Sequence, residues 1–221
     1  MLTLRTLAAW PNNVAAPIAE FLGTAILTMT FLIMAGYAAF PFYIGLSAAI
    51  ALMVVYVMFG KVSGAHANPA LTFGLWTARK VPTLRAIVYI ASQMLGGLAA
   101  WQLFQYIASR PLPAASVEFS GPVWIAEAVG TAVLAGGLCA ALSRGYDAFQ
   151  TAMTYGAALF IGLIIAALAL TSSQGFIGYI NPAVALGLRH WGTAYVFGPL
   201  LGALVGVNLY YWLFADSKNK K

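Results

Sequence analysis

Six uninterrupted apolar stretches constrain this chain more than any other feature of its sequence. A membrane-spanning helix needs about 20 predominantly apolar residues. Strands of a membrane β-barrel would instead alternate apolar and polar residues in segments of about ten. The sequence therefore predicts an all-α membrane protein with six transmembrane helices. The predicted spans are residues 15–37, 42–60, 83–108, 123–142, 149–170 and 193–214.

Composition and charge agree with a chain that lies mostly in lipid. Of the 221 residues, 62% are hydrophobic and only 7% are charged, whereas soluble domains carry about 25% charged residues. The net charge of +6 comes from basic residues that lie between apolar runs or near the chain ends, so no nucleic-acid partner is expected. With the N-terminus inside, nine of the eleven Lys and Arg residues fall on the inner side. This bias predicts cytoplasmic termini in a multi-pass protein of the plasma (inner) membrane.

The second half of the chain repeats the first. The segment Ala-Glu-Phe-Leu-Gly-Thr around Glu20 recurs as Ala-Glu-Ala-Val-Gly-Thr around Glu127, 107 residues later. The tripeptide Asn-Pro-Ala at Asn68 recurs at Asn181, 113 residues later. Each copy contains three spans, so the second copy is inverted about an axis in the membrane plane. We therefore expect one domain, residues 1–221, with an inverted 3+3 repeat of residues 15–108 and 122–214.

Each Asn-Pro-Ala opens an apolar stretch that is too short to span, residues 68–77 and 181–190. Asn is a preferred N-cap and Pro suits the first helical position. Two inverted, re-entrant half-helices would bring their positive N-terminal ends together near the midplane. With the Asn oxygens used on their own helices, both NH₂ groups would be free to hydrogen-bond a passing solute, and cations would be repelled. The expected pore midplane is Asn68, Pro69, Ala70, Asn181, Pro182 and Ala183; the alternative is two unrelated capped helices.

These motifs resemble the aquaporin and glycerol-facilitator family, the major intrinsic proteins. The resemblance covers nearly the whole chain and includes residues 63–70, Ser-Gly-Ala-His-Ala-Asn-Pro-Ala. It implies six tilted helices with two half-helices, one pore per subunit and a homotetramer. It also implies a channel that needs no cofactor or metal. No nucleophile–base pair, metal cluster or phosphate-binding loop is apparent in the sequence, so no enzyme is expected.

Two acidic residues fall inside predicted spans, Glu20 and Glu127. They could carry protons or ions, or they could hold the re-entrant loops. Since each repeat supplies one Glu for one loop, the loop-support role is favoured, and the resemblance implies the same. His66 is interpreted as a loop brace, with pore lining or pH sensing as the alternative. A coupled transporter is a less favoured reading, because it would need further titratable groups.

One position departs from the family pattern. Family members usually carry Arg directly after the second Asn-Pro-Ala, where this chain has Val184. The same spacings assign Ala48, Ala169 and Gly178 to the rest of the selectivity filter. Arg189 lies five residues beyond Val184, about 140° around a helix, so it is not expected to replace the missing cation.

A filter of small or apolar residues predicts a wide, weakly polar opening. We expect a passive channel for water and small uncharged solutes such as glycerol, urea, ammonia, hydrogen peroxide or neutral metalloid hydroxides. The alternative is a strict water channel whose filter is refilled by Tyr179, Phe176 or Tyr43.

Overall fold

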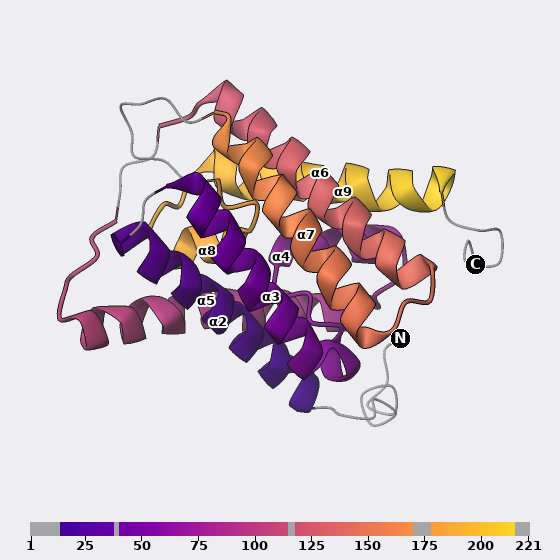
Figure 1. Ribbon diagram of the computed structural model, residues 1–221, viewed down its shortest axis with the longest axis horizontal. Coiled ribbons are helices and arrows are strands. Elements are labelled where there is room, and N and C mark those ends of the chain that lie inside the picture. Colours follow the sequence, from indigo (N-terminus) through magenta and orange to yellow (C-terminus); the bar gives the residue numbers. More distant parts are fainter. Residues whose placement is uncertain (1–13, 38–39, 115–117, 170–177, 215–221) are drawn as a thin grey trace.

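The computed structural model describes residues 14–37, 40–114, 118–169 and 178–214. Within them, six helices are long and apolar enough to cross a membrane, which confirms the predicted spans (Figure 1). The long helices are α2 (Ala15–Tyr37), α3 (Pro41–Ser63), α5 (Thr83–Ala108), α6 (Gly121–Ser143), α7 (Ala148–Ala167) and α9 (Thr193–Leu213). The short helices are α4 (Pro69–Thr77) and α8 (Pro182–Gly187).

Local sequence signals explain several helix boundaries. Pro41 and Pro122 stand in the first turns of α3 and α6, where the missing N–H costs nothing. Helix α7 begins with a capping box: Asp147 Oδ1 accepts from Gln150 N at 2.8 Å, and Gln150 Oε1 accepts from Asp147 N at 3.2 Å. The α7 helix ends at Ala167, short of the predicted end at residue 170, which lies outside the described residues.

Both short helices end in the same way. In α8, the backbone N–H of Arg189 donates to Leu186 and that of His190 donates to Ala185. This is a Schellman motif, with Arg189 in the left-handed region at φ 64°. The motif stops α8 at Gly187, three residues before the end of the predicted stretch. Helix α4 ends with the same two bonds, and Arg79 takes the left-handed position.

The helix contacts follow the repeat. Helix α2 packs against α3 and α5, and α6 packs in the same way against α7 and α9. Helices α3 and α7 join the two halves. Helix α4 packs against α9 from the other half, while α8 packs against α5. Each half-helix is therefore held in part by the last long helix of the opposite repeat (Figure 1).

Glycines allow the closest of these contacts. A Cβ on Gly202 of α9 would lie 2.1 Å from the Ala128 carbonyl oxygen of α6. In the first repeat, a Cβ on Gly96 of α5 would lie 2.4 Å from the Phe21 carbonyl oxygen of α2. Because neither position can hold a side chain without displacing backbone, these pairs of helices can approach this closely only with glycine there.

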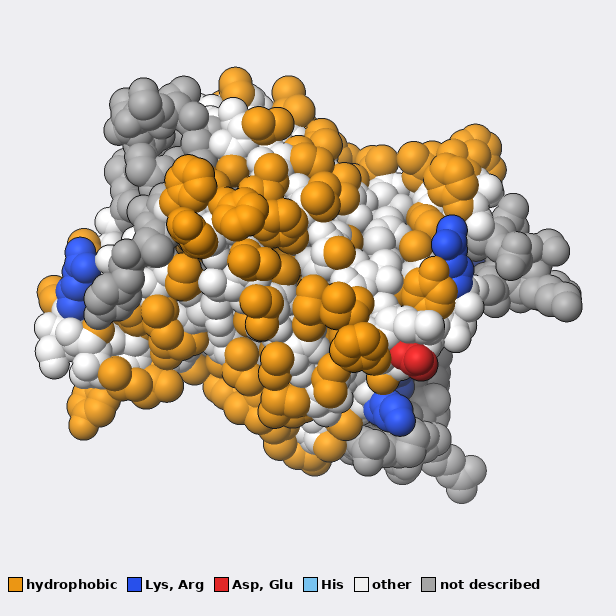
Figure 2. All heavy atoms as spheres, in the orientation of Figure 1, with side chains coloured by type: hydrophobic (Ala, Val, Ile, Leu, Met, Phe, Trp, Pro, Cys, Tyr) orange, Lys and Arg blue, Asp and Glu red, His pale blue; other side chains and the backbone are white. Residues whose placement is uncertain are grey.

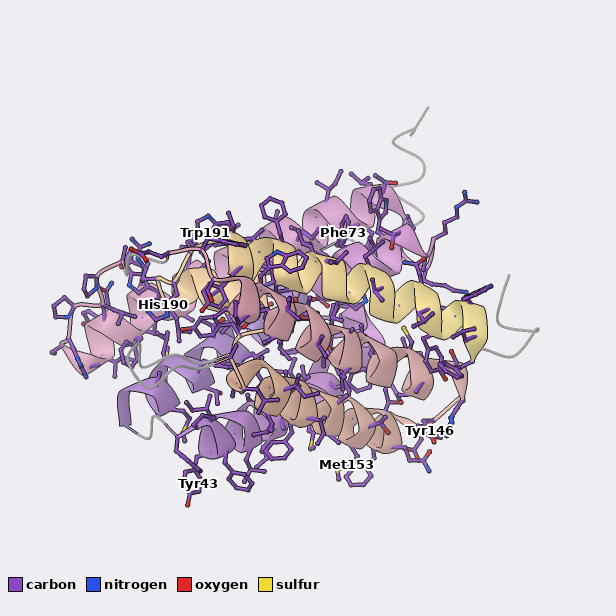
Figure 3. All side chains as sticks on the ribbon, turned by 90° about the horizontal axis from the view of Figure 1, so that it is seen from above. Tyr43, Phe73, Tyr146, Met153, His190 and Trp191 are labelled. Carbon is purple, nitrogen blue, oxygen red and sulfur yellow. The ribbon has the colours of Figure 1, made fainter. Side chains whose placement is uncertain are left out.

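The molecular surface suits a lipid environment. Figure 2 shows hydrophobic side chains over the middle of one face, with charged side chains toward its two ends. The start of α2 and the end of α9 lie at the same end of the bundle (Figure 1). Tyr146 lies near this end and His190 and Trp191 near the other (Figure 3).

Candidate functional site

The two half-helices begin inside the bundle rather than at its surface. Asn68 caps α4, and its Oδ1 accepts from Ala70 N at 2.9 Å. Asn181 caps α8, and its Oδ1 accepts from Ala183 N at 3.0 Å. Both Asn side chains are only 2% exposed, and α4 contacts α8. The two positive helix ends are therefore close together and buried inside the bundle.

The Asn side chains also join the two loops to each other. Asn68 Nδ2 donates to the Ile180 carbonyl at 2.8 Å, and Asn181 Nδ2 donates to the Ala67 carbonyl at 2.8 Å. This corrects the expectation that both NH₂ groups are wholly free. One hydrogen of each amide crosses to the opposite loop, which leaves the second hydrogen of each for another acceptor.

Glu127 of α6 is bonded to the loop of its own repeat. Its Oε1 accepts from Tyr179 N at 2.7 Å, and its Oε2 accepts from Ile180 N at 2.6 Å. The Glu127 side chain is 1% exposed. A carboxyl group in this position satisfies two backbone donors that would otherwise be buried without partners.

Glu20 of α2 makes the equivalent bonds in the first repeat. Its Oε1 accepts from His66 N at 2.9 Å, and its Oε2 accepts from Ala67 N at 2.8 Å. The side chains of Ser63 and Gln93 also donate to this carboxyl group, at 2.6 and 2.7 Å. The sequence repeat of Glu20 and Glu127 is thus matched by a repeat of hydrogen bonds.

The residue before each Asn has a left-handed backbone. Ala67 has φ 47° and Ile180 has φ 43°. This region is unfavourable for a β-branched residue such as Ile, at a cost of about 1–3 kcal/mol. Each residue donates its N–H to the Glu of its own repeat and accepts at its C=O from the Asn of the other. These bonds hold the two strained residues in place.

His66 is enclosed by neighbouring helices. Its Nδ1 lies 3.0 Å from Thr72 Oγ1 of α4, and its ring packs edge-on against Tyr89 of α5 at 5.5 Å. The Tyr155 hydroxyl of α7 donates to the His66 carbonyl at 2.8 Å. With 7% of its surface exposed, His66 contacts three helices around the first loop.

The filter positions differ in their surroundings. Ala48 and Val184 are fully buried, and Gly178 is also buried. Ala169 lies beyond the end of α7 and is partly exposed. A Cβ built on Gly178 would lie 2.3 Å from the Ala166 Cβ. Ala166 is therefore the α7 residue beside Gly178. It lies one helical turn before Ala169, and this helical periodicity is the sequence signal that could have suggested Ala166.

Arg189 and Tyr43, both considered as filter residues, have side chains that contact residues outside the filter. The Arg189 guanidinium lies over the Trp101 ring of α5, 4.2 Å from its centroid. The Tyr43 side chain is 54% exposed, and its ring contacts the rings of Phe40 and Phe42 at steep interplanar angles. Phe176, also considered, lies outside the described residues.

Tyr179 is the third large side chain considered for the filter, and it is buried. Its ring packs against Phe31 of α2 and Tyr195 of α9, and its hydroxyl is hydrogen-bonded to His190 Nδ1. These contacts place the ring among α2, α9 and the segment after α8.

A six-span bundle with two capped half-helices meeting inside it defines a class of membrane protein in which the loops line a passage. The chain matches the model of the major intrinsic protein family over residues 7–211, and it belongs to that family. It is thus a channel of the type that conducts water and small solutes, and it is not an enzyme.

Known proteins of this family resemble the chain along most of its length. It is 29% identical over 196 residues to aquaporin AqpM of Methanothermobacter marburgensis, which covers 78% of this chain and 77% of the relative. It is 30% identical to a probable TIP-type aquaporin of Medicago truncatula, over 78% of this chain and 72% of the relative. The fold matches the X-ray structure of the aquaglyceroporin from Plasmodium falciparum with a TM-score of 0.69, at 20% identity, over 93% of this chain and 97% of that one.

Proposed function

We propose that this chain is a passive channel whose outer selectivity filter is wide and apolar. The observation that carries the proposal is Val184, an apolar residue in the first turn of α8, where the family usually has Arg. The other proposed filter residues are Ala48, Gly178 and, from α7, Ala169 or its neighbour Ala166. Small apolar side chains supply neither a narrow waist nor fixed donors, so uncharged solutes larger than water can pass.

The solutes that suit such a filter are small and uncharged. Glycerol, urea, ammonia, hydrogen peroxide and neutral metalloid hydroxides fit this description, and water would pass with them. Flux follows the solute gradient, because the described spans offer few titratable groups that could couple transport to an ion.

Charge exclusion is proposed to depend on the two half-helix starts. The N-terminal ends of α4 and α8 carry partial positive charge, and Asn68 and Asn181 each retain one hydrogen for a solute. The proposed pore midplane consists of these two residues with Pro69, Ala70, Pro182 and Ala183. Protons are expected to be excluded here, although without the support of an Arg in the filter.

A strict water channel is the second candidate function. The observation that favours it is the complete burial of Ala48 and Val184, which solvent does not reach in this structure. A passage that closes this tightly would admit water only after small movements of the side chains that line it, and it would reject glycerol.

Four further statements complete the proposal. Glu20, Glu127 and His66 support the two loops, since all three contact loop backbone or the adjoining helix start. The chain forms one channel domain, with both termini on the cytoplasmic side of the plasma (inner) membrane. The assembly is a homotetramer in a lipid bilayer, as the family resemblance implies.

The test is light scattering from proteoliposomes that contain the parent chain, Val184→Arg or Val184→Leu. An impermeant sugar measures water flux, and glycerol or urea measures re-swelling. We expect the parent to re-swell quickly and Val184→Arg to suppress re-swelling more than water flux. Val184→Leu is the matched control for added bulk without charge. Fast water flux with no re-swelling by the parent would establish the strict water channel instead.

A further inference from the structure

The Tyr179 side chain makes contacts that are not needed to anchor its loop. It stands two residues before Asn181, in the loop that leads to α8. Its backbone N–H is already bonded to Glu127, so the loop has an anchor without the side chain. The side chain is nevertheless 1% exposed, packed on two rings and hydrogen-bonded to His190.

Tyr179 and His66 occupy equivalent positions in the two repeats. His66 stands two residues before Asn68, as Tyr179 stands two before Asn181. The ring of His66 packs against Tyr89 of α5, and the ring of Tyr179 packs against Tyr195 of α9. Tyr89 and Tyr195 are 106 residues apart, the same separation as Gly96 and Gly202 on these helices. Tyr179 thus occupies in the second repeat the pocket that His66 occupies in the first.

The polar atoms of the His66 and Tyr179 side chains have different hydrogen-bond partners. His66 Nδ1 reaches Thr72, which lies on the half-helix that follows its loop. The corresponding residue on α8 is Ala185, which has no polar side-chain atom. The Tyr179 hydroxyl instead bonds His190, the residue that closes the Schellman motif after α8. Tyr179 therefore links the start of α8, through its loop, to the end of α8.

His190 is held well enough to serve as an anchor. Its backbone N–H donates to the Ala185 carbonyl at 3.0 Å, which sets the point from which its side chain leaves the chain. It lies at the end of the bundle opposite Tyr146, the outer end in the proposed orientation (Figure 3).

We propose that Tyr179, tied to His190, is a positioning residue that keeps the outer part of the passage open to solutes. The inference rests on the proposed channel function. The bond holds the Tyr179 ring against Phe31 of α2 and Tyr195 of α9, and Tyr179 directly follows Gly178, which packs against Ala166. The ring is the largest side chain next to the glycine of the proposed filter. When the bond is lost, the ring is held less firmly and can shift toward the neighbouring filter residues, and this narrows the passage.

The experiment compares variants on both sides of the bond in proteoliposomes. Tyr179→Phe keeps the ring and removes the hydroxyl, and His190→Leu removes the partner atom. His190→Asn keeps a polar atom at the distance of Nδ1 from the backbone. Since losing a neutral hydrogen bond shifts a conformational equilibrium by about threefold to tenfold, Tyr179→Phe and His190→Leu should each lower glycerol permeability by about threefold or more. Water permeability should fall less, and His190→Asn should retain the parent values.

Tyr43→Phe is the matched control, because it makes the same chemical change at an exposed tyrosine near the same end of the bundle (Figure 3). The glycerol permeability of the double variant Tyr179→Phe/His190→Leu should be no lower than that of either single variant, since each single change already removes the bond between Tyr179 and His190. If the parent passes only water, the same ranking is expected for water permeability. Unchanged permeabilities in both single variants, an additive double variant, or equal losses in His190→Asn and His190→Leu would overturn the inference. A parent that passes neither water nor solute would instead defeat the proposed function itself.

Discussion

At the scale of single residues, the two loops depend on groups that act in pairs. Ile180 takes a backbone conformation that its side chain disfavours, and two hydrogen bonds hold it there. In one, the Ile180 N–H donates to Glu127 of the same repeat, and in the other, the Ile180 carbonyl accepts from Asn68 of the opposite repeat. Asn68 thereby does two tasks, because its oxygen caps α4 while its nitrogen holds the second loop.

Replacing Glu127 with Gln tests the carboxyl group as a loop support. The amide keeps one acceptor oxygen and turns an NH₂ group toward a backbone N–H, so one buried donor loses its partner. We expect a loss of about 1–3 kcal/mol in the free energy of unfolding, seen as a lower midpoint of thermal unfolding in detergent, with reduced water flux. Glu118→Gln is the control, since Glu118 is exposed. Equal midpoints for the two variants would argue against the support role.

His190 gives a prediction on pH. Burial lowers the pKa of His190 from its ordinary 6.5. As the pH falls through 6.5, the unfolded chain binds a proton there before the folded chain does, so the folded chain loses stability. The contribution is fully present above pH 6.5 and is lost below it. The unfolding midpoint of the parent, relative to His190→Gln, should therefore decrease between about pH 7.5 and 5. His66 is the same in both chains and cancels in the difference; a difference that stays constant with pH would contradict the assignment.

At the scale of elements, backbone contacts and helix ends decide the arrangement. Both half-helices end in Schellman motifs with Arg in the left-handed position, and a basic residue next to a helix C-terminus suits the negative end of the helix dipole. The recurrence of Gly198, Gly202 and Gly206 at four-residue spacing favours close packing of the last span. The structure identifies the partner as α6, whose Trp124, Ala128 and Ala132 carbonyl oxygens lie opposite these glycines.

Gly202→Ala tests this contact. The added methyl group would lie 2.1 Å from the Ala128 carbonyl oxygen, so α9 must move away from α6. We expect overpacking to lower the free energy of unfolding by about 1–3 kcal/mol, with a smaller yield of monodisperse protein after size-exclusion chromatography. Gly136→Ala on α6 is the matched control, because a Cβ there has nothing within 4 Å. A Gly202→Ala protein that behaves like Gly136→Ala would show that α6 and α9 pack less closely than described.

At the scale of the whole molecule, an apolar band separates two charged ends (Figure 2). Six spans place the start of α2 and the end of α9 at one end of the bundle (Figure 1). From the distribution of Lys and Arg, we propose that this end is cytoplasmic.

Cysteine labelling tests the proposed orientation. In a Cys139→Ala background, which removes the sole cysteine, single cysteines replace Arg110 between α5 and α6 or Asp147 before α7. Both positions are exposed. A membrane-impermeant maleimide added to intact cells should label Arg110→Cys alone, and both variants should react after lysis. Labelling of Asp147→Cys in intact cells would reverse the orientation.

Much of this protein could be predicted from its sequence alone, because the signals are local or repeated. Apolar run length determines the six spans, and Asn-Pro marks the start of each half-helix. The recurrence of Glu20 as Glu127 and of Asn68 as Asn181, at offsets of 107 and 113 residues, reveals the repeat, and three spans per copy make it inverted. These features need no knowledge of which residues meet across the bundle.

The tertiary structure decided the rest, because it depends on contacts between distant residues. One amide hydrogen of each Asn crosses to the opposite loop, although the sequence favoured free NH₂ groups. Ala166 rather than Ala169 meets Gly178, because packing at the end of α7, and not spacing along the chain, decides which residue lies against it. Arg189 stacks on Trp101 and Tyr179 bonds His190. Sequence spacing places a residue along its own helix, but only packing decides which neighbour its side chain reaches.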